Sequence, residues 1–253
     1  IECLTKRCLW RGIEVEIIPL TISSKSTFSE QSEKNFNLKS SIVFMGGGED
    51  TDQKLLYEDF VNNKGPWLKE YIKNNGVGLF ICGGFQFLGH YYRPYSGSDI
   101  PGLGIVDLYT QHFGRDKKRC VGNITTKIIG IDELKQTANT NPPHSNGGFL
   151  VGFENHGGRT YLGNATQPLG KIITGSGNNG EDKTEGVIYK NTIGTYLHGP
   201  LLPKNPHLAD WLIKTALEQT YKKKVDLQPL NDNLEWEAHK LIAHTPMDSL
   251  SRH

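Results

Sequence analysis

Apolar runs and helical patterns alternate along the first half of the chain. The apolar runs predict strands at residues 15–18, 41–45 and 77–81. Helical spacing is found at residues 1–10 and 55–74, with an interruption near Gly65-Pro66, and another helix is expected at residues 86–91. Strands separated by helices are typical of a parallel sheet with both faces covered. The first half therefore predicts an α/β fold.

The pattern changes after residue 105, where strands and turns follow one another without long helices between them. Strands are expected at residues 123–129, 149–153, 170–174, 186–190 and 192–196. We expect these strands to form a more antiparallel half. Helices are expected at about residues 207–223 and 234–244. Residues 137–148 contain few apolar side chains and predict a surface loop.

Composition and charge exclude several classes of protein. The 253 residues have a formal net charge of +1, which favours neither nucleic acid nor an anionic membrane surface as a general partner. No apolar run approaches the roughly 20 residues needed to span a bilayer. The four cysteines form no Cys-x-x-Cys pair, so neither a zinc knuckle nor a disulfide framework is expected, and no metal site is predicted. We expect a reducing, cytoplasmic environment, and we expect that a native segment precedes Ile1.

The stretch GLFICGGFQFLG places Cys82 where an apolar strand meets two glycines. A strand that turns sharply into a helix through small residues projects the turn residue beyond the edge of the sheet, as in a nucleophile elbow. The start of the following helix lowers the pKa of a thiol at that point. The alternative is a packed cysteine whose glycines only begin a helix. The glycines favour Cys82 as a nucleophile.

A thiol nucleophile requires a base, which should come from the end of another strand. His198 in GTYLHGP follows a short strand pattern and precedes chain-breaking residues, and His156 in FENHGGRT is the rival base. The glycine turns at residues 46–48 and after Cys82 can supply backbone N–H groups to an oxyanion. A phosphate-binding role for the first turn is the alternative, although the G-x-x-x-x-G-K-[ST] pattern is absent.

Several motifs in order resemble one enzyme family. The strings FICGGFQ, FENHGGRTYLG, GSGNN and GTYLHGP, with the triple glycine at residues 46–48, are similar to the class I (triad) glutamine amidotransferases. Within that superfamily the chain resembles the cobyric-acid-synthase type, and most specifically the glutaminase subunits of lipid II isoglutaminyl synthases. The resemblance implies one glutamine amidotransferase domain over residues 1–253, with a flavodoxin-like, mostly parallel sheet flanked by helices, an antiparallel strand extension and C-terminal helices.

The resemblance also implies roles for individual residues. Cys82 would attack the side-chain amide of glutamine, and His198 would carry the proton to the leaving ammonia. The backbone N–H groups of Gly48 and Gly83 would hold the oxyanion. Water would then release glutamate from the thioester.

Two further residues are expected to bind substrate. Arg119 in KKRCVG matches an arginine of the family that binds glutamine, and a guanidinium suits bidentate capture of an α-carboxylate. Its alternative is a solvated member of a basic run. Gln86 would line the pocket or cap the start of the helix.

Two departures from the family pattern affect the site. The bulky Phe80 stands two residues before Cys82, where a small residue is common. Pro200 stands where the wider family has the triad glutamate, two residues after the histidine. Either a dyad operates, or the third carboxylate comes from elsewhere, and the resemblance is consistent with an acidic residue supplied by a partner.

The resemblance implies a glutaminase subunit that hydrolyses L-glutamine and delivers ammonia to a Mur-ligase-like partner in a heterodimer. The partner would use ATP and Mg²⁺ to amidate the α-carboxyl of D-glutamate in the lipid II stem peptide, at the inner face of the membrane. This chain would need no cofactor, and it would reach lipid II only through the partner. The alternatives are a glutaminase module of another cobyric-acid-synthase-like amidating enzyme, a free-standing cysteine hydrolase, or a non-catalytic binding subunit.

Overall fold

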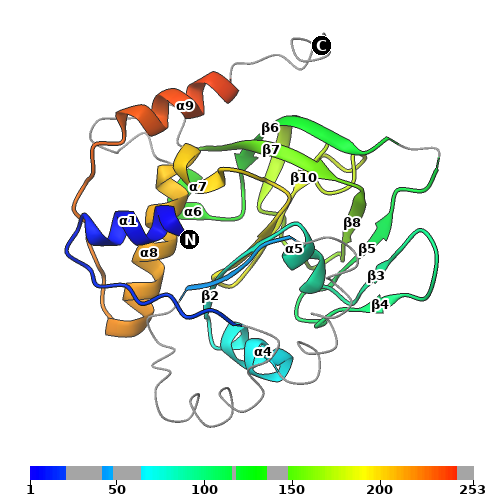
Figure 1. Cartoon of the computed structure of the whole chain (residues 1–253), viewed down its shortest axis with the longest axis horizontal. Helices are drawn as coiled ribbons and strands as arrows, with labels where there is room; N and C mark the ends of the chain where they lie inside the picture. The colour runs from blue at the N-terminus through cyan, green and yellow to red at the C-terminus, as the bar shows by residue number, and fades with distance from the viewer. Residues whose placement is uncertain (21–41, 48–63, 116–117, 136–147, 244–253) are drawn as a thin grey trace.

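A computed structural model describes residues 1–20, 42–47, 64–115, 118–135 and 148–243 of the chain (Figure 1). The predicted surface loop at residues 137–147, the predicted helical stretch at residues 55–63 and Gly48 lie outside these residues. No described helix is both long enough and apolar enough to cross a membrane.

The central sheet has the strand order β1-β2-β12-β11. Its strands are β1 (Ile42–Met45), β2 (Val77–Ile81), β12 (Thr192–Thr195) and β11 (Val187–Tyr189). β2 is buried along its whole length and pairs in parallel with both β1 and β12, whereas β11 is antiparallel to β12. The continuous apolar sequence of β2 suits a strand covered on both faces. β2 and β12 therefore end side by side at the same edge of the sheet.

Apolar side chains pack on both faces of this sheet in two clusters. One cluster joins Leu79 of β2 to α1 (Glu2–Leu9) and α8 (Pro206–Tyr221). The other joins Phe80 to α4 (Gly65–Lys73) and α5 (Gly83–Phe87). Successive side chains of a strand point to opposite faces, so neighbouring residues of β2 enter different clusters. The strand that carries Cys82 at its end is thus fixed from both sides.

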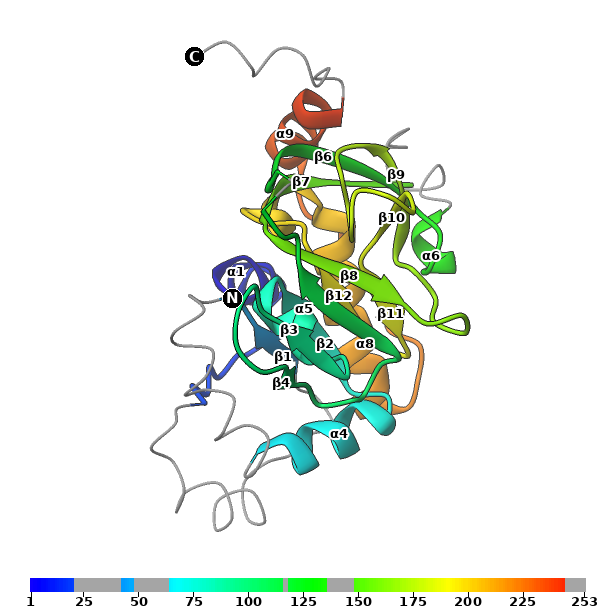
Figure 2. The same cartoon turned by 90° about the vertical axis from the view of Figure 1, so that its right-hand side faces the viewer.

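Two smaller sheets flank the central one (Figure 2). The antiparallel sheet β10-β9-β6-β7 contains β10 (Thr184–Glu185), β9 (Gly170–Thr174), β6 (Cys120–Ile128) and β7 (Phe149–His156). The mixed sheet β4-β3-β5-β8 contains β4 (Ile100–Pro101), β3 (Tyr91–Arg93), β5 (Leu108–His112) and β8 (Gly158–Leu162).

Three helices complete the described structure: α6 (Asp132–Lys135), α7 (Leu201–Lys204) and α9 (Asn233–Ala243). The buried Arg7 of α1 donates hydrogen bonds to Asp210 of α8 and to Asp232, just before α9. Elements from both ends of the sequence are therefore joined by one buried ion network.

The sequence-based expectations for the elements are largely confirmed, with three corrections. Residues 15–18 form no strand; three of them are exposed apolar side chains, Val15, Ile17 and Ile18. The helix expected at residues 86–91 begins earlier, at Gly83, and ends at Phe87, since Tyr91 already begins β3. The strands expected at residues 186–190 and 192–196 both belong to the central sheet, where β12 pairs in parallel with β2 and antiparallel with β11.

Candidate active site

Cys82 stands at the sharp turn between β2 and α5. Its φ of +53° and ψ of −109° are unusual for a residue with a side chain. The N–H of Cys82 donates to the carbonyl of Thr195 on β12 (3.0 Å), and its own carbonyl accepts from the N–H of Gln86 (3.0 Å). A Cβ at Gly84 would lie 2.6 Å from the carbonyl oxygen of Met45, so only glycine fits this turn. The geometry is that of a nucleophile elbow.

The glycine turn after β1 lies directly against the thiol. A Cβ at Gly47 would lie 3.1 Å from Cβ of Cys82, and 3.5 Å from both its Sγ and the backbone nitrogen of Gly83. The absence of a side chain therefore lets backbone approach the nucleophile. The oxyanion role expected for Gly83 stays a prediction, and Gly48 lies outside the described residues.

His198 follows β12, beside the end of β2. Thr195 is in register with Ile81, which directly precedes Cys82. The backbone N–H of His198 donates to the carbonyl of Phe153 on β7 (2.8 Å), which fixes this point of the chain against the antiparallel sheet. Burial lowers the pKa of the imidazole, and the nearby charge of Arg119 lowers it further. A lowered pKa favours the neutral imidazole, the form that can accept a proton.

The ring of His198 has no carboxylate beside it in the described part of the chain. Its Nε2 is buried and makes no hydrogen bond to any described residue, and no ion pair joins the ring to an Asp or Glu there. Pro200 occupies the position of the usual triad acid. Cys82 and His198 therefore lie at neighbouring strand ends, and the described residues place no orienting acid at the imidazole.

His156, the rival base, is sealed inside the protein. Its ring stacks on Tyr196 with centroids 3.7 Å apart and an interplanar angle of 7°, and Nδ1 lies 2.8 Å from the carbonyl oxygen of Gly158. Burial is the main cause that lowers its pKa to about 4. A neutral ring that donates Nδ1–H to a carbonyl fits this geometry. The arrangement favours His198 as the base and His156 as a structural residue.

Glu154, the acid near His156, makes its hydrogen bonds with backbone N–H groups. Glu154 is buried, and its carboxylate accepts hydrogen bonds from the N–H groups of Ser176 and Gly177 at 2.8 to 3.1 Å. Its Oε2 is 4.0 Å from Nε2 of His156, beyond hydrogen-bond distance. Burial raises the pKa of Glu154.

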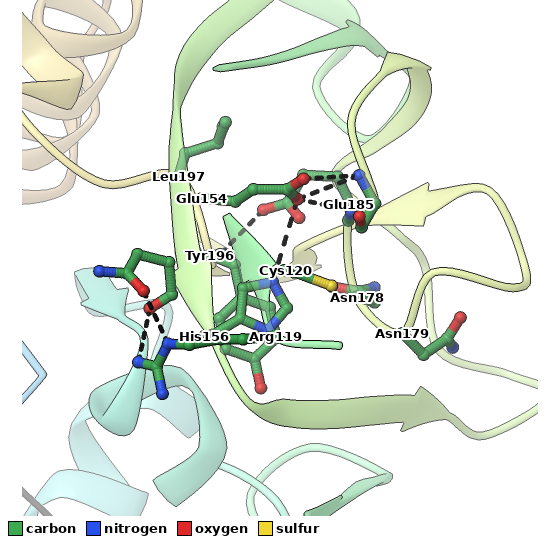
Figure 3. Close-up of polar contacts among 12 residues, drawn as sticks. Arg119, Cys120, Glu154, His156, Asn178, Asn179, Glu185, Tyr196 and Leu197 are labelled. Atoms are coloured by element: carbon green, nitrogen blue, oxygen red, sulfur yellow. Dashed lines mark hydrogen bonds and ion pairs between the residues drawn. The ribbon is translucent and has the colours of Figure 1, made fainter. Parts of the chain in front are cut away.

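Arg119 lies just before β6 and is exposed. Its Nε donates to Oδ1 of Asn155 (2.7 Å) and its Nη2 to the backbone carbonyl of Asn155 (3.2 Å) (Figure 3). Its charge influences both His198 and His156, so the guanidinium lies near the strand ends that carry the site. This position suits capture of an anionic substrate group, which stays a prediction.

Gln86 lies beneath the site and is only 8% exposed. Its Nε2 donates to Oη of Tyr196 (3.0 Å), and that hydroxyl also lies 2.7 Å from Oγ1 of Thr160. A Cβ at Gly158 would lie 2.5 Å from the Gln86 amide nitrogen. Gln86 thus connects α5 to the end of β12, and its predicted contact with substrate is untested by this geometry.

Glu185 supports the strand end that precedes His198. It is completely buried, and its Oε1 accepts hydrogen bonds from Oγ1 of Thr195 (2.5 Å) and from the N–H of Tyr196 (2.9 Å). Burial is the main cause that raises its pKa to about 7. The carboxyl group thereby fixes the chain just before His198.

In the described part of the chain, no group of three or more His, Cys, Asp or Glu side chains could hold a metal ion.

Comparisons with known proteins agree with this geometry. Residues 14–206 match the CobB/CobQ-like glutamine amidotransferase domain. The chain is 38% identical over 244 residues to the lipid II isoglutaminyl synthase (glutamine-hydrolyzing) subunit GatD of Staphylococcus aureus (strain N315), covering 96% of this chain and 86% of that protein. It is 40% identical over 196 residues to the protein of the same name from Streptococcus pneumoniae (strain ATCC BAA-255 / R6), covering 78% and 68%.

The fold has a solved counterpart as well. A crystal structure of a glutamine amidotransferase superposes with a TM-score of 0.51 at 16% identity, covering 85% of this chain and 93% of that chain. The domain match spans both the cysteine elbow and the histidine strand end, and the two relatives extend it over most of the sequence. The chain belongs to the CobB/CobQ-like glutamine amidotransferase family.

Proposed function

We propose that this chain is the glutaminase subunit of a lipid II isoglutaminyl synthase. The observation that carries the proposal is the placement of Cys82, with its φ of +53°, beside the strand end that carries His198. Two relatives at 38% and 40% identity bear that subunit name. The product would be ammonia, delivered to a Mur-ligase-like partner of the MurT type.

The chemistry follows from the two side chains. His198 accepts the thiol proton of Cys82, and the sulfur attacks the side-chain carbonyl carbon of glutamine. Backbone N–H groups, including that of Gly83, stabilise the oxyanion. The intermediate expels ammonia, which takes its proton from His198, and leaves a thioester on Cys82. Water then attacks the thioester with His198 as base, releasing glutamate and restoring the thiol.

The partner is proposed to supply the missing acid. An imidazole without a carboxylate loses control of its tautomer and ring direction, which costs about 10⁴ in rate in the serine-protease case. The two buried acids among the described residues are engaged elsewhere, Glu154 with Ser176 and Gly177, and Glu185 with Thr195 and Tyr196. An Asp or Glu of the partner would therefore complete the site at His198.

The rest of the proposed reaction belongs to the partner. A Mur-ligase-like subunit would bind ATP and Mg²⁺, activate the α-carboxyl of D-glutamate in the lipid II stem peptide and accept the ammonia. The heterodimer would work at the inner face of the membrane, where that substrate is presented. Docking across the ends of β2 and β12 would close the site and keep ammonia from water.

The test is a glutaminase assay of this chain alone and with its Mur-ligase-like partner. We expect low activity alone and a rise of at least tenfold in the complex, because the partner restores general-base orientation. Neutralising the partner's carboxylate nearest to His198 should reverse the rise without dissociating the subunits. Full activity of the isolated chain on glutamine would contradict the partner's role, and hydrolysis of other amides in preference to glutamine would favour a free-standing cysteine hydrolase.

A further inference from the structure

The last residues of β7 place two side chains on opposite faces of the strand. His156 packs inward on Tyr196, whereas the preceding Asn155 contacts the exposed Arg119. The antiparallel register with β6 pairs Cys120 with His156 and Val121 with Asn155, so Arg119 lies just beyond the paired residues. Because successive side chains of a strand point to opposite faces, His156 of the FENH motif packs in the interior while Asn155 contacts Arg119.

The contacts of Asn155 occupy one particular edge of the guanidinium. Nε donates to the side-chain oxygen of Asn155 (2.7 Å), and Nη2 donates to its backbone carbonyl (3.2 Å). A guanidinium carries five N–H donors in a rigid planar fork. With the Nε side held, the edge formed by Nη1 and Nη2 keeps the donors needed for a second, bidentate partner.

Arg119 is exposed, and no described residue hydrogen-bonds to Nη1 on the remaining edge. The neighbouring Gly157 has no side chain; a Cβ there would lie 3.6 Å from Nη1, in van der Waals contact with it. The charge of Arg119 also influences the imidazole of His198, so this edge is near the reacting groups.

An unrestrained arginine on a surface would not aim this edge in one direction. A long exposed side chain samples many rotamers, and holding it in one geometry costs conformational entropy. A side chain already oriented by hydrogen bonds loses less conformational entropy when a ligand binds. Asn155 provides such a restraint.

We propose that Asn155 is a specificity-determining positioning residue that aims the Nη1–Nη2 edge of Arg119 at the α-carboxylate of glutamine. The inference rests on the proposed function. It assigns to Asn155 the discrimination between glutamine and amides that lack an α-carboxylate.

The test compares two substrates in the complex of this chain with its partner: L-glutamine and 4-aminobutyramide, which keeps the amide and amine but lacks the α-carboxylate. Asn155→Ala should raise KM for glutamine about tenfold, the size of one charge-assisted hydrogen bond, with kcat within about twofold. It should leave kcat/KM for 4-aminobutyramide unchanged. In an Arg119→Ala background it should have no further effect, because the group that it positions is gone.

Two variants keep the test decisive. Val121→Ala changes the exposed residue opposite Asn155 without touching the guanidinium, and should leave both substrates unaffected. Asn155→Asp keeps an oxygen at the same place but adds a negative charge beside the arginine, so it should also raise KM for glutamine alone.

Three outcomes would overturn the inference. One is equal impairment of both substrates by Asn155→Ala, and another is an additive loss in the Arg119→Ala background; either would indicate a structural role only. The third is an unchanged KM for glutamine in Arg119→Ala, which would remove the carboxylate-binding role while leaving the glutaminase assignment intact. Absence of glutamine hydrolysis by the unaltered complex would contradict the proposed function and this inference together.

Discussion

The ends of β12 and β7 both carry a histidine, and in both rings the pKa is lowered and a buried Nε2 makes no hydrogen bond to a described residue, yet the two rings differ in exposure and packing. His198 is partly exposed, and its ring lacks a hydrogen bond or acidic neighbour in the described part of the chain. His156 is 1% exposed, stacked on Tyr196 and hydrogen-bonded to the carbonyl of Gly158.

The difference shows why position at a strand end does not by itself make a base. A catalytic imidazole must reach its substrate and exchange a proton, which requires access and a ring nitrogen that is not already engaged. His156 lacks access, and burial lowers its pKa to about 4, so its ring is a neutral structural group. We call the surroundings of His156 the sealed region, and the ends of β2 and β12, with Cys82 and His198, the open region. The sealed region holds the shape of the site, and the open region carries the candidate catalytic side chains.

Replacing each histidine separately tests this division most strongly. His198→Ala should lower kcat for glutamine hydrolysis in the complex by a factor on the order of 10² or more, because proton transfer is lost. His156→Ala should act mainly through local packing, so its loss in activity should follow its loss in thermal stability. Initial rates and melting temperatures of the two purified variants decide the matter, and the reverse ranking in folded protein would overturn the assignment of the base.

Much of the open region could be predicted from sequence. The apolar run of β2 and the two glycines after Cys82 specify a buried strand and a tight turn, which are local properties. GTYLHGP likewise specifies a short strand followed by chain breakers. The partnership of β2 with β12 could not be read locally, and residues 192–196 were wrongly assigned to the antiparallel half because parallel pairing joins segments far apart in sequence.

The sealed region was less predictable, because its strands also pair with segments far away in the sequence. β5 and β8 mix aromatic, polar and small residues, so neither gives a clear strand pattern, and both were missed. Glu185 hydrogen-bonds with Thr195 and Tyr196, and Asn155 with Arg119, and no periodicity of the sequence encodes these contacts. Residues 15–18 show the opposite failure, because an apolar run predicts a strand only where another strand can pair with it.

The buried Glu185, which supports the strand before His198, gives a smaller effect that depends on pH. Because the pKa of Glu185 is raised from 4.5 to about 7 in the folded state, the folded chain holds the proton more tightly than the unfolded chain. Its contribution is therefore lost as pH rises through that window. Between pH 5 and 7.5 the unfolding free energy of the wild type should fall by about 2 kcal/mol relative to Glu185→Gln, which does not titrate.

Denaturant unfolding at several pH values measures this difference, with the exposed Glu237→Gln as the matched control. A constant offset between Glu185→Gln and wild type at all pH values would contradict the titration. The Glu185→Gln variant also tests whether Glu185 takes part in catalysis or only supports the strand. If Glu185 only supports the strand before His198, Glu185→Gln should keep most glutaminase activity in the complex, whereas a loss as large as that of His198→Ala would assign the third catalytic group to this chain.

The most direct test of the central claim is to identify the cysteine that reacts with a glutamine analogue. The diazoketone 6-diazo-5-oxo-norleucine alkylates an active-site thiolate with loss of nitrogen, and peptide mass spectrometry locates the adduct. We expect a single adduct on Cys82, complete loss of ammonia release, protection by glutamine, and no adduct in Cys82→Ala. Labelling at Cys3, Cys8 or Cys120 instead, or full glutaminase activity in Cys82→Ala, would contradict the account.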